Sequence, residues 1–446
     1  MRALFSASLT LYSSNVFALT SSELPVPLNT SLDFLWILIS AVLVFIMQAG
    51  FLAFEVGCVR PKSIISVAIK NVIDWTMVTL VFFLFGFGFM FGSSSTGFIG
   101  TDLFLLQSIT DVHPLGMVFF LFQLAFAATA ATIVSGAMSE RTALIPYLWG
   151  SFFIGLIIYP VFGHWVWGTA LLDSNKPFLA ELGFIDFAGS TVVHGVGGWA
   201  ALVGVAFIGP RMGRYDADGN PRSMKSFSIA WSALGLFILW FGWWGFNGGS
   251  TGSFNTEVGE ILVNTNISAA SAGIAALAHC WFVQKKDAVY EKFMGGILGG
   301  LVAITASCNM VSPISALIIG ACAGVIHNIG FSMNVYKLKL DDPVGAIPVH
   351  LYCGIWGSLC VALFGRQEML VHSRIEQIGI QLLGILACAL WTVGTSLVMF
   401  KILKTVIGLR VSPQEEKDGI QIERRLNVRQ TGEKISEDEL KKLMGL

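Results

Sequence analysis

The sequence contains two histidines deep inside apolar, glycine-rich stretches. His194 lies in STVVHGVGGWAALVG, and His350 lies in IPVHLYCGIWGSLC. An ionisable side chain inside a membrane span is costly, so each histidine is a candidate for function. Two facing imidazoles can share a proton and offer one donor and one acceptor to a small polar solute. The competing interpretation is two unrelated histidines, each hydrogen-bonded to a backbone carbonyl.

Aromatic residues gather at the predicted outer ends of apolar segments and are suited to binding a cation. The faces of Trp and Phe rings attract a cation through their quadrupoles, and a hydroxyl such as that of Ser250 can accept one of its N–H bonds. A site of this kind suits a small, weakly hydrated monovalent cation, whereas a divalent metal needs carboxylates. An interfacial aromatic belt is the alternative for part of this set. The aromatic residues are Phe122, Phe126, Trp165, Trp167, Trp243, Trp244 and Phe246.

Asp186 lies eight residues before His194, at the start of the same apolar segment. As an N-cap, its carboxylate would accept backbone N–H bonds from the first helical turn and interact favourably with the helix dipole. A carboxylate at this separation from a mid-membrane histidine could also steer a cation. Both roles stay open on the sequence alone.

Other polar residues within apolar segments are interpreted as structural. Lys70 and Asp74 have the i, i+4 spacing of a helical ion pair, and we expect Glu55 to join them near the cytoplasmic side. His279 and His327 are expected to be hydrogen-bonded core residues. The seven cysteines are scattered without a CxxC pair, and we interpret them as small buried apolar residues.

The composition indicates what kind of structure must position these residues. The chain has 446 residues, of which 54% are hydrophobic and 12% are charged, whereas a soluble domain carries about 25% charged residues. This composition excludes a water-soluble globule, and the net charge of −1 gives no indication of nucleic-acid binding. The apolar segments contain no HExxH motif and no carboxylate pair. We therefore expect an integral membrane protein that is not an enzyme and has no cofactor or metal site.

Eleven apolar runs are long enough to cross a bilayer, for which a helix needs about 20 residues. Basic residues in short loops stay cytoplasmic. Twelve of them lie in one set of alternate loops: Arg60, Lys62, Arg141, Arg211, Arg214, Arg222, Lys225, Lys285, Lys286, Lys292, Lys337 and Lys339. The opposite set holds three: Lys176, Arg366 and Arg374. This difference predicts an N-terminus outside and a C-terminus in the cytoplasm, in the inner membrane of the cell, and supports an odd number of spans.

The expected fold is all-α, with two five-helix halves of inverted topology followed by a long final helix. In this arrangement His194 and His350 occupy equivalent places in the fifth and tenth spans. The predicted spans are 33–58, 64–92, 115–138, 142–163, 188–209, 227–249, 258–284, 293–309, 312–335, 344–365 and 375–405.

The two ends of the chain differ in character from residues 33–405, the predicted transmembrane domain. Residues 1–18 are interpreted as a cleavable signal peptide, with Arg2 as a weak positive start and a small-residue cleavage site at 16–18. A disordered N-terminal tail is the alternative. Residues 406–446 are rich in charge and can bury little, so we expect them to form a cytoplasmic C-terminal tail.

Several motifs, in this order and spacing, give the chain a recognisable pattern. They are GFLAFEVGCVRPKS, SGAMSER, GHWVWG, DFAGSTVVH, GWWGFNGGS, DDPVGAIPVH and GLRV. Together they resemble the ammonium transporter (Amt/Mep/Rh) family, and the Amt branch in particular, over roughly residues 33–420. The resemblance implies an eleven-helix protomer, a homotrimer and one pore in each protomer.

The same resemblance implies roles for the residues singled out above. Ammonium would bind at an outer site, pass a gate of phenylalanines and meet two pore histidines. The outer site would comprise Phe126, Trp167 and Ser250, supported by Asp186; the gate would comprise Phe126 and Phe246 with Phe122 nearby; the pore histidines would be His194 and His350.

The hypothesis that follows is ammonium transport. NH₄⁺ would be recruited at the aromatic site and deprotonated, because an unpaired ion in an apolar pore is far more costly than a neutral polar molecule. NH₃ would then pass the histidines. The alternative is an ammonium sensor that passes a signal through its cytoplasmic tail to a signalling domain, with little or no flux.

The chain departs from the Amt pattern in three ways, one at a helix end and two in the C-terminal tail. Gly345 stands where the pattern usually has an aspartate, and Gln421 stands in the tail where it usually has another. The tail then continues without the usual ending. Docking of a PII-type regulator is therefore open on the sequence.

Overall fold

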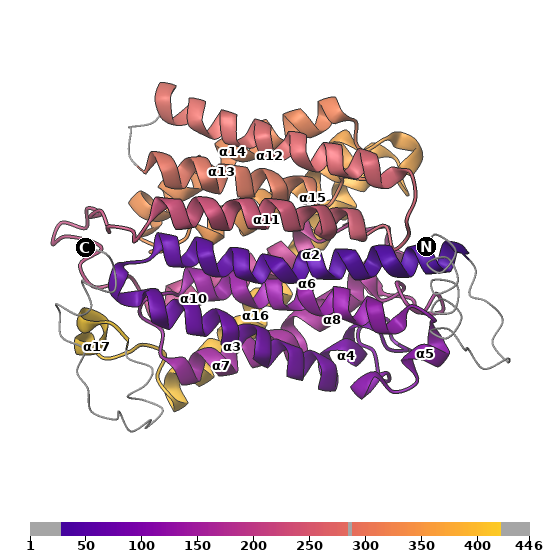
Figure 1. Cartoon of the computed structure of the whole chain (residues 1–446), viewed down its shortest axis with the longest axis horizontal. Helices are drawn as coiled ribbons and strands as arrows, with labels where there is room; N and C mark the ends of the chain where they lie inside the picture. Colours follow the sequence, from indigo (N-terminus) through magenta and orange to yellow (C-terminus); the bar gives the residue numbers. More distant parts are fainter. Residues whose placement is uncertain (1–27, 284–287, 421–446) are drawn as a thin grey trace, which may run out of the picture.

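The structure is a computed structural model that describes residues 28–283 and 288–420. Its helices run side by side along the long axis of the bundle (Figure 1). The short helix α17, Pro413–Asp418, lies at one end of the bundle, and the short helix α5, Ile109–Val112, lies at the other (Figure 1). We call the end with α17 the inner end and the end with α5 the outer end. The predicted signal peptide at 1–18 lies outside the described residues.

Within the described residues, ten helical segments are long and apolar enough to cross a membrane. They are Asn29–Cys58, Pro61–Phe91, Gly116–Ala137, Leu144–Trp167, Ser190–Ile208, Ile229–Gly249, Glu257–Phe282, Pro313–Leu338, Ile347–Phe364 and Arg374–Val406. Each coincides with a predicted span, and the last is the expected long final helix. The all-α class is confirmed, since the described residues form two isolated β-bridges and no strand ladder.

The eighth predicted span, 293–309, corresponds to a shorter helix. Helix α13, Val289–Ile304, has 16 residues, and the chain turns between residues 305 and 310 before the next helix begins at Pro313. From residue 294 to its end, every residue of α13 is buried. A helix enclosed by neighbouring helices does not need the full length of a lipid-exposed span, because protein covers its ends.

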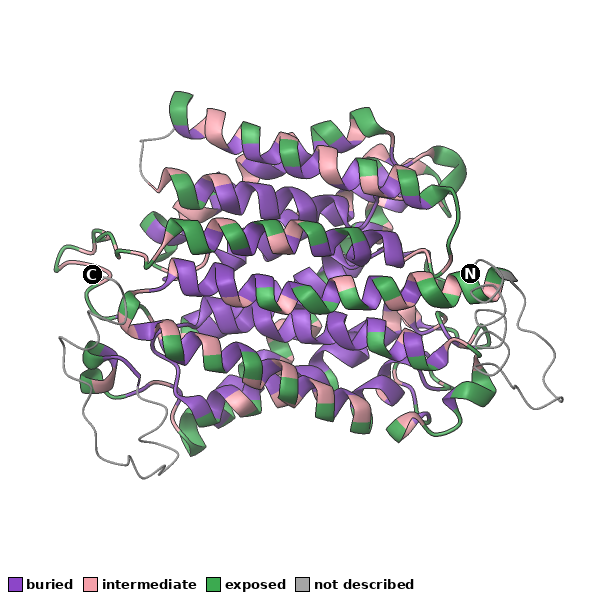
Figure 2. Ribbon diagram, viewed as in Figure 1, coloured by how far each residue is buried: buried purple, intermediate pink, exposed green. Residues whose placement is uncertain are grey.

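Helices α2, Leu28–Cys58, and α11, Ile229–Gly249, pack along each other in the middle of the bundle (Figure 1). Gly235 permits this contact, since a Cβ atom there would stand 2.3 Å from the backbone nitrogen of Phe54. Small residues of this kind allow membrane helices to approach closely. Figure 2 shows buried residues concentrated inside the bundle and exposed ones on its outer face. Large apolar residues such as Phe237 and Leu390 are among the exposed ones, as a lipid-facing surface requires.

Several spanning segments contain a π-helical turn. Helix α3, Ile64–Val81, passes through such a turn into α4, Phe87–Phe91, and α7, Leu144–Phe153, passes through another into α8, Tyr159–Trp167. Two further turns open segments at the centre of the bundle: η5, Ser190–Gly195, precedes α10, Val196–Ile208, and η7, Ile347–Tyr352, precedes α15, Cys353–Phe364. π-Helical turns occur often at functional sites. The remaining long helices are α6, Gly116–Ala137; α12, Glu257–Phe282; α14, Pro313–Ser332; and α16, Arg374–Val406.

The first part of the C-terminal tail is folded back onto the inner loops. Its backbone pairs with the loop after α6, where Ala143 N donates to Leu409 O at 2.9 Å and Val411 N donates to Arg141 O at 3.0 Å. Glu416 is buried and accepts hydrogen bonds from both Nε and Nη2 of Arg410, at 3.0 and 2.7 Å. These contacts fix residues 408–420 against the bundle, which is more order than a charged tail suggests from composition.

A buried set of ion pairs lies next to this docked segment. Glu140 pairs with Arg60 and Arg211, and Arg211 also pairs with Asp341 at 2.8 Å. Burial alone would raise the pKa of Asp341, but its contacts with Arg211 hold that pKa well below its usual range. The carboxylate therefore stays charged and joins loops from both halves of the chain.

Candidate functional site

The two histidines meet at the centre of the bundle. The Nδ1 atoms of His194 and His350 lie 3.1 Å apart, and the two rings stack with centroids 5.1 Å apart and planes 20° from parallel. Both side chains are buried. At this distance one Nδ1 must donate and the other must accept, so the pair shares one proton between its facing nitrogens. The Nε2 atom of His194 is buried without a hydrogen-bond partner among the described residues.

The same local structure carries each histidine. In DFAGSTVVH and DPVGAIPVH, an aspartate stands eight residues before the histidine and a glycine five residues before it. Gly189 has φ +111° and Gly345 has φ +72°, which is the left-handed region that glycine enters without strain. Each glycine precedes one of the π-helical turns η5 and η7. The repeat therefore builds two equivalent supports for two facing side chains.

The aspartates of the repeat satisfy the backbone at the start of each turn. Asp186 accepts hydrogen bonds from the backbone nitrogens of Gly189, Thr191 and Val192 at 3.0, 2.9 and 2.8 Å. Burial raises the pKa of Asp186 to about 6, although these N–H bonds act in the opposite direction. The carboxylate therefore caps the segment that carries His194, and it is still ionised at neutral pH.

Asp342 holds the second turn in the same way. It accepts from the backbone nitrogens of Gly345 and Ile347 at 3.0 and 2.7 Å, and burial raises its pKa. Our sequence analysis did not identify Asp342. The sequence does contain a signal for this residue, because the D-x-x-G-x-x-x-V-H pattern that ends at His194 is repeated before His350.

Aromatic rings cover the pair on its outer side. Phe126 and Phe246 stack face to face with centroids 4.0 Å apart, and Phe246 stacks on His194 at 5.5 Å. Trp243 also stacks on His194, at 5.2 Å, and its Nε1 donates to the hydroxyl of Thr305 at 2.9 Å. The sequence placed Trp243 in the aromatic set without a role. Its ring packs against the imidazole of His194, so it belongs to the surroundings of the histidine pair.

The remaining predicted outer residues lie around Phe126. The ring of Trp167 approaches Phe126 edge-on at 6.2 Å, and its Nε1 donates to the backbone oxygen of Asp186 at 2.8 Å. Phe122 contacts Phe126 at 4.6 Å. The hydroxyl of Ser250 donates to the backbone oxygen of Phe246 at 2.8 Å, so its lone pairs can accept from a ligand.

Two other tryptophans of the aromatic set are turned elsewhere. Trp165 contacts Trp391 with centroids 5.4 Å apart, and its Nε1 donates to the backbone oxygen of Phe98. Trp244 is exposed, and its Nε1 lies 3.4 Å from the side-chain oxygen of Asn266. These residues fit the packing and interfacial roles that the sequence left open.

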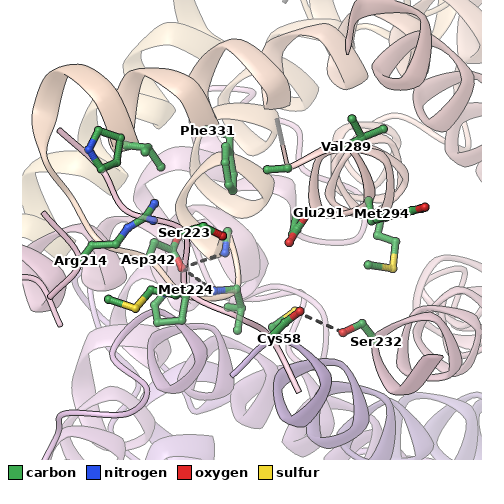
Figure 3. A pocket seen from close by; sticks show the side chains of 18 of the residues that line it. Cys58, Arg214, Ser223, Met224, Ser232, Val289, Glu291, Met294, Phe331 and Asp342 are labelled. Atoms are coloured by element: carbon green, nitrogen blue, oxygen red, sulfur yellow. Dashed lines mark hydrogen bonds between the residues drawn. The ribbon is translucent and has the colours of Figure 1, made fainter. Parts of the chain in front are cut away.

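Two cavities lie on the inner side of His350. A small one, of about 20 Å³, is lined by His350, Glu55 and Thr132 among others. A larger one, of about 520 Å³, opens toward the inner loops, and Phe54 and Val344 line both. Figure 3 shows the larger cavity, whose lining includes Arg214, Glu291, Phe331 and Asp342. His327 also lines it, with its Nδ1 3.1 Å from Oδ1 of Asn328.

Glu55, Lys70 and Asp74 interact electrostatically, as expected, and each also has hydrogen-bond partners outside the group. Lys70 Nζ donates to the carbonyl of Thr142 at 2.7 Å, and Asp74 accepts from Tyr147 and Ser151. Glu55 accepts from the side-chain nitrogen of Asn71 at 3.1 Å. Glu55 also lines the small cavity next to His350.

Residues 28–283 and 288–420 contain no group of three or more His, Cys, Asp or Glu side chains placed to hold a metal ion. The site offers aromatic faces, a hydroxyl acceptor and imidazole nitrogens. This set can attract a small cation at the outer end and hydrogen-bond a small neutral solute at the centre.

Comparison with known proteins gives a consistent result along the chain. The family model described as Ammonium Transporter Family matches residues 35–425. Ammonium transporter Amt2 of Archaeoglobus fulgidus is 42% identical over 418 residues, which cover 90% of this chain and 87% of the relative. Ammonium transporter 1 member 3 of Solanum lycopersicum is 38% identical, with 88% of this chain and 91% of the relative covered. A solved structure titled Sensor Amt Protein is 44% identical, with a TM-score of 0.87 over 91% of this chain and 99% of that chain.

Proposed function

Because the chain belongs to the ammonium transporter family, a family of membrane transporters and not of enzymes, we propose a specific route for ammonium through it. NH₄⁺ binds at the outer aromatic site, loses a proton there, and continues as NH₃ along the two histidines. The proposal includes a homotrimer with one pore in each protomer. It also includes a cytoplasmic C-terminus, in accordance with the basic residues of the inner loops.

Recruitment rests on Phe126, Trp167 and Ser250. The two rings offer electron-rich faces to a cation, and the Ser250 hydroxyl accepts one N–H. Asp186, which is buried behind Trp167, adds a negative charge that favours a cation over an anion at this end. The site thus selects for positive charge and N–H donors together.

Deprotonation follows from the stack below that site. The rings of Phe126 and Phe246 stack 4.0 Å apart and present apolar surface above His194, where an ion that enters without its hydration shell is strongly disfavoured. NH₃ carries no net charge and can hydrogen-bond to the unpartnered Nε2 of His194. K⁺ has no proton to lose, so the same stack rejects it.

The single observation that carries this function is the contact between His194 and His350 beneath the stacked phenylalanines. The test is ammonium uptake and ammonium-driven current in proteoliposomes that contain the wild type, His194→Ala or His350→Ala. We expect transport or its selectivity over K⁺ to change in both variants. His372→Ala, which alters an exposed histidine before α16, serves as the control. Transport and selectivity that are unchanged in both pore variants would remove the histidines from the mechanism.

A second function is supported by one comparison. The solved structure with 44% identity is titled Sensor Amt Protein, so an ammonium receptor is the alternative for this chain. In that case ammonium would bind at the same outer site and the C-terminal tail would pass a signal to a signalling domain or a PII-type regulator. Ammonium binding to the purified protein, without uptake in proteoliposomes, would favour the sensor.

A further inference from the structure

Glu55 occupies a position that the route described above does not use. It lies in the last two turns of α2, and its side chain is buried, with the whole residue 2% exposed. Oε2 accepts a hydrogen bond from Asn71 Nδ2 at 3.1 Å. This bond uses one of the two carboxylate oxygens and explains how the side chain is positioned. It does not explain why an ionisable group is placed at this depth, where a buried charge is costly.

The second oxygen of Glu55 points toward α6. A Cβ atom on Gly136 would stand 3.3 Å from Oε1 of Glu55 and 2.8 Å from the side chain of Val344. The glycine therefore leaves room for the carboxylate beside the small cavity that His350 also lines. In this cavity a titratable carboxylate and a titratable imidazole from opposite halves of the chain share one space.

The size and lining of this cavity suit a single water molecule. A volume of about 20 Å³ exceeds what one water requires, and such a water needs two to four polar partners. Glu55, His350 and the hydroxyl of Thr132 can supply them. One water between the imidazole and the carboxylate would connect them for proton transfer, while Phe54 and Val344 separate it from the larger cavity.

We propose that Glu55 is the inner proton acceptor of this pore, and the proposal rests on the ammonium transport proposed above. The N–H bond of ammonium breaks at the outer site, and its proton passes to His194 and across the shared Nδ1 contact to His350. From His350 the proton moves through the cavity water to the Glu55 carboxylate, where an O–H bond forms. NH₃ that arrives in the cavity takes this proton, so that NH₄⁺ re-forms and Glu55 returns to its carboxylate.

The charged surroundings of Glu55 allow such a cycle. Lys70 and Asp74 act on it from α3, and Asp342 acts on it from the loop before η7. One cation and two other carboxyl groups surround it, and the negative charge among them favours the arrival of a proton. His350 is the titratable group that shares the small cavity with Glu55.

The test measures current and ¹⁵N-ammonium uptake together, in proteoliposomes that hold the full chain. Glu55→Gln keeps the size of the side chain and an acceptor for Asn71 but cannot take up a proton. Glu291→Gln is the matched control, because it removes the same charge from the wall of the larger cavity (Figure 3). Glu55→Asp retains a titratable group that is one methylene shorter. Taking the ratio of current to uptake makes the result independent of how much protein inserts.

We expect the current per ammonium taken up to fall by about tenfold or more in Glu55→Gln and to stay within about twofold of wild type in Glu291→Gln. Uptake in Glu55→Gln would continue as neutral NH₃, and Glu55→Asp would regain part of the current. A ratio in Glu55→Gln equal to that of the wild type would overturn the role of Glu55 alone, as would uptake without current in the wild type. Wild-type vesicles with neither uptake nor current would overturn the transport function itself.

Discussion

Replacement of Glu416 by glutamine tests whether the first part of the tail is held by its buried carboxylate. The carboxylate accepts from Met212 N at 2.7 Å and from Nε and Nη2 of Arg410. A glutamine keeps one acceptor oxygen, which can stay with Met212 N. It then turns its NH₂ group toward the guanidinium, so the two charge-assisted hydrogen bonds to Arg410 are lost.

The magnitude follows from these contacts and from the exposure of Arg410. Two charge-assisted hydrogen bonds would contribute about 3–6 kcal/mol if both groups were buried. The side chain of Arg410 is 31% exposed and also donates to the backbone oxygens of Ile208 and Pro210, so it recovers part of this in water. We therefore expect the docked segment to lose about 1.5–3 kcal/mol, an increase of roughly 10- to 150-fold in its opening.

Hydrogen exchange measures this opening directly. The backbone N–H groups of Val411 and Ala143 bridge the tail and the loop after α6, and both should exchange faster in Glu416→Gln by the factor given above. Asp418→Asn is the control, since it removes an equal charge from an exposed position of the same short helix. If Val411 exchanged at the wild-type rate in Glu416→Gln, the carboxylate would not be what holds the segment.

Three further predictions concern the pore. Ser250→Ala should weaken the apparent affinity for ammonium by about two- to tenfold, because one hydrogen bond to the ligand is lost. Uptake measured over a series of ammonium concentrations gives this affinity. The pKa of Asp186 is about 6, so its negative charge is present above that pH and is lost below it. At constant NH₄⁺, the apparent KM for uptake should therefore rise as the outer pH falls from 7 to 5, and Asp186→Asn should remove this dependence. Thr305→Val removes the acceptor of Trp243 and should lower uptake several-fold, whereas Thr305→Ser should restore it; equal rates in both variants would contradict a positioning role.

Much of the fold follows from hydropathy and loop charge, because lipid imposes a length and a composition on each span. The exception is α13, Val289–Ile304, which begins and ends several residues before the predicted span 293–309. Its sequence is apolar from Phe293 to Ile304, so composition does not reveal that the chain turns after Ile304. Burial inside the bundle, which depends on the neighbouring helices, determines where this helix ends.

The site was predictable where the residue type itself is unusual for its surroundings. Histidines in apolar spans are rare, so His194 and His350 stood out, whereas Asp342 and Trp243 acquire meaning only through residues that are distant in the sequence. Glu55 illustrates the limit most clearly. The i, i+4 spacing within one helix relates Lys70 to Asp74. It carries no information on which carboxylate faces a cavity whose lining comes from several helices that are distant in the sequence.

The larger inner cavity has an electrical consequence. Its volume of about 520 Å³ and its charged walls admit water deep into the bundle, as far as Phe54 and Val344. The voltage across the bilayer must then fall mainly over the short stretch between these side chains and the stacked phenylalanines. The free energy of each elementary charge that crosses this stretch changes by about 2.3 kcal/mol at a membrane potential of 100 mV, whereas that of a neutral molecule does not change. Membrane potential would thus act on a proton in this conduit and leave ammonia unaffected.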